Sequence, residues 1–316
     1  MASVSSASGG EVSSCHSTSG GGASGGCTNH GIPGGFDVVP ALPGEALQSR
    51  PMASSRLDTA LVERGLVPSR ARAQAAVASG RVRINGHVAD KSSTPVEAEA
   101  TLVVESAPEF VSRGGEKLAG ALADLDLDVT GVRALDLGAS TGGFTDCLLQ
   151  RGAAHVTALD VGYGQLAWTL RQDPRVTVLE RTNARHLMPD AVTPPADFAT
   201  CDLAFISVAT VWPAASRCLT PDHRALVLVK PQFEVGKGKV PQGGVVRDPL
   251  LHAESIRHVA RAIAAQGGRV RAVVASQLVG PKGNREFFIY CEGPETEARP
   301  RLDLEQAITD AVGGPS

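Results

Sequence analysis

The segment that most constrains the fold runs from Arg133 to Asp146 and reads RALDLGASTGGFTD. It opens with a short apolar run, which is typical of a buried parallel strand. Three glycines follow, and then an apolar-periodic segment, Phe144 to Leu149, that predicts a helix. A strand, a glycine turn and a helix in this order let the backbone approach a ligand at a helix N-terminus.

The spacing of the glycines narrows the choice of ligand. They do not follow the G-x-G-x-x-G pattern of dinucleotide-binding turns. An acid, Asp160, ends the next apolar strand about twenty residues on, where a carboxylate can hold ribose hydroxyls. Together with Asp136, ahead of the first glycine, it suits a nucleoside that carries an amino-acid tail. We therefore expect S-adenosylmethionine as the cofactor.

Beyond the glycine turn, strands and helices alternate, which is the pattern of a doubly wound α/β sheet. The last two strands leave no room for a helix between them, so the final strand is expected to return antiparallel. Asp248 followed by Pro249 marks a helix start, and Arg301 to Val312 predicts an amphipathic helix over the sheet. The expected strands are Arg133–Leu137, His155–Asp160, Val176–Glu180, Asp197–Leu203, Ala225–Lys230, Arg269–Ser276 and Glu286–Cys291.

Composition limits the class of protein. A chain of 316 residues can form one large and one small domain. Its hydrophobic content of 42% is ordinary for a soluble protein. No stretch approaches the roughly 20 apolar residues of a membrane span, and no secretory signal is visible. The six cysteines form no C-x-x-C pair, so we expect no disulfide framework, no metal site and a cytoplasmic location.

The first 52 residues form a Ser/Gly-rich leader that is too poor in large apolar groups to fold. Cys15, His16, Cys27 and His30 lie in this leader, but nothing around them would support a metal site. Met52 stands just before the first patterned segment. One hypothesis is that translation starts at Met52, the leader being either an artefact of gene calling or a dispensable tail.

Residues 53–107 predict a small α+β domain. Ser69 is the expected N-cap of a helix from Arg70 to Ser79, with Gly80 just past its end. The dipeptide Asn85-Gly86 predicts a β-hairpin on a type I′ turn.

The same segment is basic. Between Arg56 and Lys91 there are seven Lys or Arg against three Asp or Glu, and clustered positive charge attracts phosphate backbones. Charge alone fits a solvated helix face equally well. However, the RLD at Arg56, the SR-x-x-A at Ser69 and the G-x-V-x-I-N-G at Gly80 resemble the S4 RNA-binding domain. That resemblance implies docking on structured RNA. The candidate RNA-binding residues are Arg56, Arg70, Arg72, Arg81, Arg83 and Lys91.

Polar residues at the carboxyl ends of the expected strands are candidates for chemistry, because ligands of open α/β sheets bind there. These residues are Asp136, Asp160, Asp202 and Lys230, and an antiparallel last strand would bring Glu286 to the same edge. Each alone could be a solvated charge, but together they favour a function. They suit methyl transfer to an alcohol, which requires alignment of the reactants and removal of a proton from a weak acid.

A neutral lysine amine can accept the proton of a ribose hydroxyl. Free lysine has a pKa of about 10.4, and a second cation and partial burial lower it, while a carboxylate orients the amine. Lys117, Asp202, Lys230 and Glu286 supply this combination. By its sequence context alone, Lys117 would more often be a solvated charge on a helix from Glu116 to Leu122.

Seven blocks in order resemble the TlyA family. This family comprises S4-domain ribosomal-RNA methyltransferases that act on the 2′-hydroxyl of cytidine and are often mislabelled haemolysins. The resemblance implies a Rossmann-like seven-stranded methyltransferase sheet over residues 108–316, preceded by the S4-like domain. The blocks are Ser112–Leu118, Leu135–Thr145, Asp160–Trp168, Glu180–Arg185, Asp202–Ser207, Val229–Glu234 and Gly283–Phe288.

The resemblance also implies roles for residues. Lys230 would be the general base, Lys117 and Asp202 its electrostatic neighbours, and Glu286 would position lysine or ribose. Ribosomal RNA or a ribosomal subunit would be the partner, with no role for a membrane. The implied cofactor residues are Asp136, Gly138, Ser140, Gly142, Phe144, Asp160, Thr182, Asn183 and Asp202, although Thr182 and Asn183 could instead cap a helix.

Two further expectations concern the loop at 231–248 and the two tryptophans. The Gly- and Lys-containing loop at 231–248 directly follows Lys230, which favours a lid over a mere connection. Trp168 and Trp212 are expected to be packing residues.

Three other functions fit the sequence less well. A non-catalytic RNA-binding or ribosome-assembly factor would not need the lysine–carboxylate set. A membrane-lytic haemolysin would need an apolar span or a long amphipathic basic helix. A pseudouridine synthase would leave the glycine turn unexplained.

Overall fold

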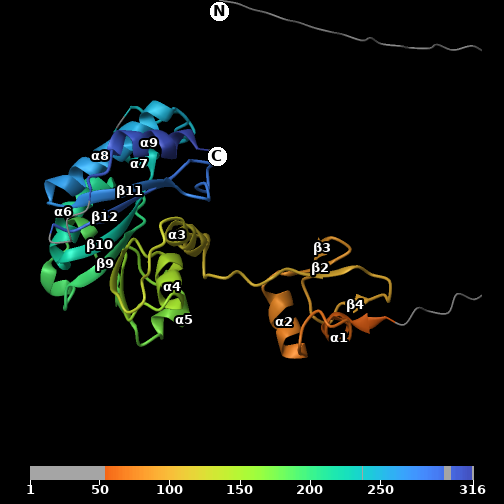
Figure 1. Cartoon of the computed structure of the whole chain (residues 1–316). Coiled ribbons are helices and arrows are strands. Elements are labelled where there is room, and N and C mark those ends of the chain that lie inside the picture. The colour runs from red at the N-terminus through yellow and green to blue at the C-terminus, as the bar shows by residue number, and fades with distance from the viewer. Residues whose placement is uncertain (1–53, 237, 295–299, 315–316) are drawn as a thin grey trace, which may run out of the picture. The chain divides into compact units, whose positions relative to one another are not determined.

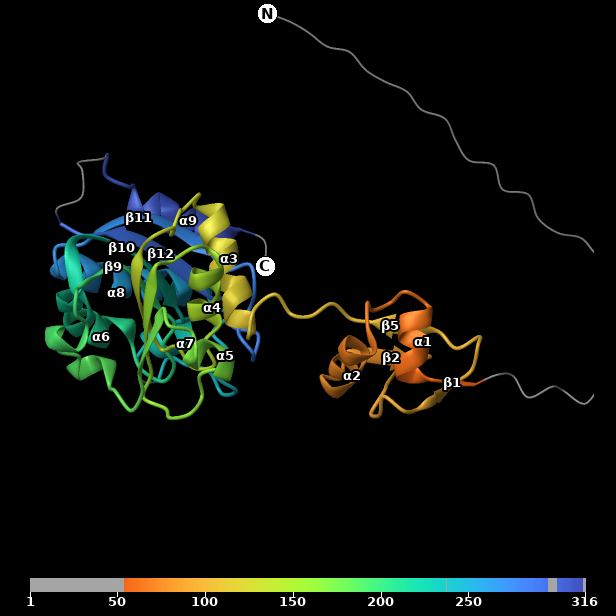
Figure 2. The same cartoon turned by 90° about the horizontal axis from the view of Figure 1, so that it is seen from below.

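The computed structural model describes residues 54–236, 238–294 and 300–314. The expectations for the leader, including its cysteines and Met52, lie outside the described residues. Figures 1 and 2 show the described chain as a smaller and a larger unit.

The smaller unit packs two helices against short strands. β2 lies between β3 and β5, and β1 pairs with β4. The hydroxyl of Ser69 accepts a hydrogen bond from the backbone N–H of Arg72, which confirms the predicted cap of α2. Asn85 and Gly86 both have positive φ, as a type I′ turn requires. The elements are β1 (Ser55–Arg56), α1 (Leu57–Glu63), α2 (Arg70–Ala78), β2 (Val82–Ile84), β3 (His87–Val88), β4 (Pro95–Val96) and β5 (Leu102–Val104).

The larger unit is built on a seven-stranded sheet of order β11-β12-β10-β9-β6-β7-β8. β12 runs antiparallel to both of its neighbours, as predicted for the final strand, and the other pairs are parallel. The strands are β6 (Arg133–Leu137), β7 (His155–Leu159), β8 (Val176–Leu179), β9 (Ala196–Cys201), β10 (Leu219–Val229), β11 (Arg269–Ala275) and β12 (Phe287–Glu292).

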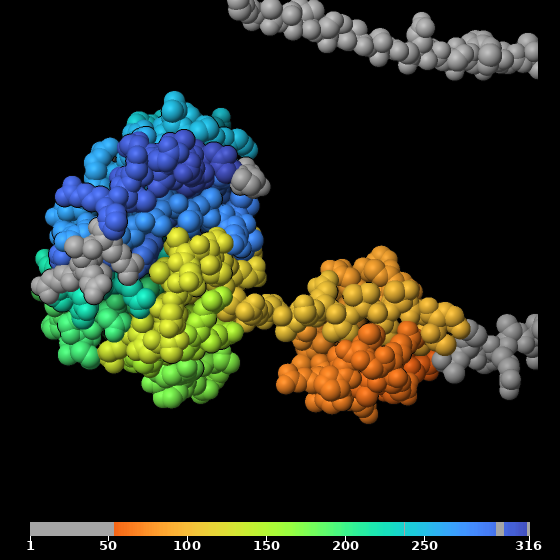
Figure 3. Space-filling view, in the orientation of Figure 1, coloured from red at the N-terminus to blue at the C-terminus, as the bar shows by residue number. Residues whose placement is uncertain are grey.

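Helices cover both faces of this sheet, because successive strand residues point to opposite faces. In β6, Ala134 joins the apolar cluster of α3 and α4, while Leu135 and Leu137 join the cluster of α6, α8 and α9. The exposed side of α3 forms the yellow surface in Figure 3. The helices are α3 (Arg113–Asp124), α4 (Gly143–Gln150), α5 (Trp168–Arg171), α6 (Val208–Ala215), α7 (Pro231–Glu234), α8 (Pro249–Ala265) and α9 (Leu304–Gly313), with 3₁₀ turns η1 (Ala184–His186), η2 (Pro189–Ala191) and η3 (Ser216–Cys218).

Two expectations need correction. β10 begins at Leu219, well before the predicted Ala225. Trp212 is buried as expected, but the Trp168 side chain lies on the surface, with the residue 67% exposed, so its prediction as a packing residue was wrong. Within the described residues, no helix is long and apolar enough to cross a membrane.

Candidate functional site

The glycine turn after β6 brings backbone from two strands into contact. Gly138 has φ +87°, and a Cβ atom there would collide with the carbonyl oxygen of Asp202. The N–H groups of Gly138 and Ala139 donate to the carbonyl of Leu159, at 2.9 and 3.0 Å. Gly142, at φ +99°, begins α4. Position 138 requires glycine, because its backbone is left-handed and packs closely against the backbone of Asp202.

Asp136 lies beneath this turn and not on its surface. Its carboxylate is fully buried and accepts hydrogen bonds from the hydroxyls of Thr145, at 2.7 Å, and Thr200, at 2.9 Å. Burial raises the pKa of Asp136 to about 6. It thereby ties β6 to α4 and β9, and it does not line the cavity above the turn.

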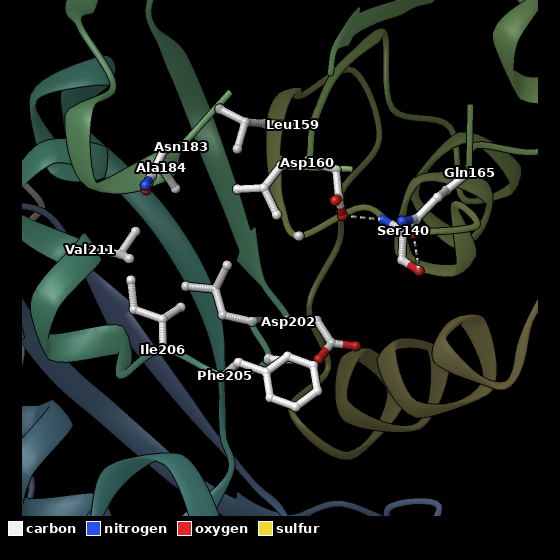
Figure 4. A pocket seen from close by; sticks show the side chains of 14 residues that line it. Ser140, Leu159, Asp160, Gln165, Asn183, Ala184, Asp202, Phe205, Ile206 and Val211 are labelled. Carbon is white, nitrogen blue, oxygen red and sulfur yellow. Dashed lines mark hydrogen bonds between the residues drawn. The ribbon is translucent and has the colours of Figure 1, made fainter. Parts of the chain in front are cut away.

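A cavity of about 410 Å³, here called the glycine-turn cavity, opens above the turn (Figure 4). One Asp160 oxygen accepts from the Ser140 N–H at 2.8 Å, and the other accepts from the Gly162 N–H at 2.7 Å. These bonds fix a carboxylate at the wall of the cavity. The predicted cofactor residues that line it are Gly138, Ser140, Asp160, Asn183 and Asp202, and its apolar residues include Leu203, Ile206 and Val211.

Gly142, Phe144 and Thr182, which were also predicted to bind the cofactor, do not line this cavity. Phe144 lines the neighbouring cavity, and Gly142 lies at the start of α4. The hydroxyl of Thr182 donates to the Glu180 carbonyl at 3.1 Å. Asn183 caps η1 through a bond from the Arg185 N–H at 3.0 Å, so the cap interpretation and the cavity position both apply to it.

The four predicted catalytic residues come together at the carboxyl edge of the sheet. Lys117 Nζ donates to Glu286 Oε2 at 2.5 Å. Lys230 Nζ lies 2.5 Å from Asp202 Oδ1, forming a second ion pair. Both pairs line one cavity of about 360 Å³, the tetrad cavity, together with Gly138 and Ser140.

The two ion pairs differ in burial. The side chains of Lys117 and Glu286 are 8% and 1% exposed, whereas those of Lys230 and Asp202 are 14% and 22% exposed. Asp202 also lines the glycine-turn cavity. The Lys230–Asp202 pair is therefore the one that an incoming group could reach, while Lys117–Glu286 lies deeper.

A third cavity of about 360 Å³, the loop cavity, also reaches Lys230 and Glu286. The loop after Lys230 contributes Gln232, Phe233 and Val240 to its wall. Lys230 thus lines two cavities, one beside the glycine turn and one beside the loop.

The loop from Pro231 to Asp248 is fastened near both ends. Buried Glu234 accepts from the Ser207 hydroxyl at 2.6 Å and the Val208 N–H at 2.8 Å. Near the other end, the Val246 N–H donates to Asn284 Oδ1 at 2.9 Å. The role of this loop as a lid stays a prediction.

The basic residues of the smaller unit are on its surface or half-buried. Arg56 and Arg70 both pair with Asp58. Arg83 pairs with Glu105 at 2.7 Å, and Arg81 donates to the Glu105 carbonyl at 3.1 Å. The other two candidates, Arg72 and Lys91, form no ion pair within the described residues.

Comparison with known proteins places this site in a family. The profile of FtsJ-like methyltransferases matches residues 110–292, and that of the S4 domain matches residues 55–102. The 16S/23S rRNA (cytidine-2′-O)-methyltransferase TlyA of Mycobacterium tuberculosis is 51% identical over 264 residues, covering 83% of this chain and 98% of the relative. This chain belongs to the TlyA family.

Two other proteins are similar to this chain over most of its length. Hemolysin A of Brachyspira hyodysenteriae is 34% identical, covering 74% of this chain and 98% of that protein. A solved structure from Streptococcus thermophilus is 36% identical with a TM-score of 0.63, covering 83% of this chain and 95% of that one.

Two cavity residues escaped the sequence analysis, although both lie in blocks typical of the TlyA family. Gln165 lines the glycine-turn cavity, and its Oε1 accepts from the Ser140 hydroxyl at 3.4 Å. Phe205, which lies between that cavity and the loop cavity, is 93% exposed at φ +66°. An aromatic residue three positions after the strand-end acid Asp202 was the available signal, because ligands bind at that edge.

Proposed function

We propose that this TlyA-family enzyme transfers a methyl group from S-adenosylmethionine to the ribose 2′-hydroxyl of cytidine in ribosomal RNA. The observation that carries the proposal is the pair of lysine–carboxylate contacts in one cavity beside the glycine turn. A binding protein has no need of two partly buried lysines held at a ligand cavity, whereas proton removal from an alcohol requires such a group.

The glycine-turn cavity fits the proposed methyl donor. Its volume of about 410 Å³ lies in the range of small-molecule sites. Asp160 offers a fixed carboxylate to ribose hydroxyls, and Leu203 and Ile206 offer an apolar wall to an adenine ring. When bound, S-adenosylmethionine supplies an activated methyl group on a sulfonium centre.

The residues of the chain then act on the acceptor. The proton of the 2′-hydroxyl passes to Nζ of Lys230 once that ammonium group has released its own proton to solvent, because only the free amine has acceptor capacity. The oxygen forms its new bond to the methyl carbon, and the bond from that carbon to sulfur breaks. Asp202 holds Lys230 beside the glycine turn. Lys117, fixed by Glu286, contributes a positive charge next to the reacting oxygen.

The S4 domain supports RNA as the substrate. Its basic residues offer charge to a phosphate backbone, and the Mycobacterium tuberculosis relative bears the name of a 16S/23S rRNA methyltransferase. We place the reaction on ribosomal subunits in the cytoplasm.

Mapping ribose methylation in ribosomal RNA from cells with and without this gene tests the proposal. We expect at least one cytidine 2′-O-methyl group to disappear with the gene and to return with the wild-type gene. An unchanged ribose-methylation map would refute the proposed function.

A further inference from the structure

One buried acid joins two of the predicted RNA-binding arginines. Asp58, at the start of α1, accepts from Arg56 Nε at 3.1 Å and from Arg56 Nη2 at 3.0 Å. Its Oδ2 also accepts from Arg70 Nη2 at 3.0 Å and from Gln74 Nε2 at 3.2 Å. The arginines belong to different elements, β1 and α2, so Asp58 connects parts of the chain that are separate in sequence.

The acid and the arginines differ sharply in exposure. The Asp58 side chain is 0% exposed, whereas those of Arg56 and Arg70 are 51% and 57% exposed. A buried carboxylate is costly unless it is paired, and here several donors satisfy it. The bond from Arg56 holds the pKa of Asp58 well below its usual range. RNA could therefore reach the guanidinium groups but not the acid that holds them.

The shared carboxylate also places the guanidinium groups side by side. Both Nη2 atoms lie 3.0 Å from the same oxygen, so they lie within twice that distance of each other. Two free arginines would repel and would each lose rotamer freedom on binding a ligand. Each guanidinium has five N–H donors, and in the described part of the chain Nη1 of Arg56 and of Arg70 remains available.

We propose that Asp58 is a positioning residue that holds Arg56 and Arg70 as a preformed clamp for a phosphate group of the RNA backbone. The inference rests on the proposed function, because it takes RNA as the ligand. It goes beyond that function by assigning a positioning role to a buried residue that RNA would not contact.

The substitution Asp58→Asn separates positioning from simple charge. It removes a negative charge near the RNA, so a charge-only account predicts tighter binding. The clamp predicts weaker binding by about tenfold, because two arginines must be ordered when RNA binds. The measurement is the affinity of the full chain for 16S and 23S rRNA transcripts at fixed salt. The control is Asp90→Asn, which removes an exposed acid of the same domain and should leave affinity unchanged or slightly higher.

If thermal unfolding shows that Asp58→Asn does not fold, a second variant that keeps the charge of the wild type can be tested instead. Arg70→Lys retains the charge but cannot bind carboxylate and phosphate with one planar group. We expect it to weaken binding several-fold, and by more than Arg72→Lys, which alters another candidate RNA contact on the same helix that forms no ion pair within the described residues.

The double variant Arg56→Ala/Arg70→Ala distinguishes positioning from a general structural effect. In that background Asp58 has no arginines to hold, so adding Asp58→Asn should no longer weaken binding. An equal loss in both backgrounds, or tighter binding by Asp58→Asn alone, would overturn the clamp. If the wild-type chain binds neither transcript, the proposed function fails instead.

Discussion

Lys117 and Lys230, the two lysines at the edge of the sheet, differ in their exposure to solvent. Lys117 is buried and bonded to buried Glu286. Lys230 lines the tetrad and loop cavities, and Asp202 lines the tetrad and glycine-turn cavities. This asymmetry favours Lys230 as the group that receives a proton and Lys117 as a fixed charge.

The substitution Lys230→Met should abolish most of the activity. Loss of a general base typically lowers the rate by about 10²–10⁴-fold, and we expect methyl transfer to fall by that amount with S-adenosylmethionine affinity nearly unchanged. Lys239→Met is a matched control, because Lys239 pairs with Glu254 on the surface at 2.5 Å. Full activity in the Lys230 variant would exclude this lysine as the base.

Asp136 gives the protein a defined pH response. Its folded-state pKa of about 6 exceeds its ordinary value of 3.8, because burial disfavours the charged form. As pH rises from about 4 to about 6, the unfolded chain releases this proton before the folded chain does. The group therefore reduces the free energy of unfolding over that window, by about 3 kcal/mol in total.

The variant Asp136→Asn should lack this contribution. Denaturant unfolding at several pH values from 4 to 7 would give the difference in stability between wild type and variant. We expect the wild type to lose stability relative to the variant across the window. A difference that does not change with pH would contradict the assignment.

Sequence reasoning found the residues of the site but not their partners. Asp202, Lys230 and Glu286 were predictable because each lies at a strand end, whereas the role of Lys117 was implied only by the resemblance to the TlyA family. Which lysine pairs with which acid was not predictable, because Lys117 and Glu286 are 169 residues apart in sequence. The same holds for Asp136, whose position beneath the turn depends on Thr200 from another strand.

At the scale of elements, the turn between β6 and α4 depends on one glycine. Gly138→Ala combines an unfavourable φ with a collision against the Asp202 carbonyl, so we expect loss of S-adenosylmethionine binding. Gly131→Ala is the matched control, since Gly131 has φ +75° with nothing within 4 Å of an added Cβ. It should lower stability by about 1 kcal/mol and leave binding intact. Calorimetric titration measures both variants, and equal affinities would disprove the close-packing argument.

The sheet was largely predictable because its central strands are continuous apolar runs. β6 has the predicted bounds, and β7, β8 and β11 are each one residue shorter at their ends. The early part of β10 was missed because it is polar, and its pairing with β9 is irregular between Leu219 and Arg224. The early part of β10 is a strand because it pairs with β9, and not because of its local sequence pattern.

At the scale of the whole molecule, RNA binding and methyl-donor binding should respond differently to salt. Six basic residues of the S4 domain are the predicted phosphate contacts. If all are used, the affinity for rRNA should fall by up to about a thousandfold between 50 and 200 mM salt. S-adenosylmethionine affinity, measured at the same salt concentrations, should change little. An rRNA affinity that is independent of salt would contradict phosphate recognition by this domain.

The product of the reaction tests the proposed methyl transfer from S-adenosylmethionine to the ribose of cytidine. The purified full chain is incubated with S-adenosylmethionine carrying a labelled methyl group and with unmodified ribosomal subunits, and the digested RNA is analysed by nucleoside mass spectrometry. We predict the label in 2′-O-methylcytidine and its absence with the Lys230→Met variant. Label in a base-methylated nucleoside, or no label with the wild-type chain, would contradict the account.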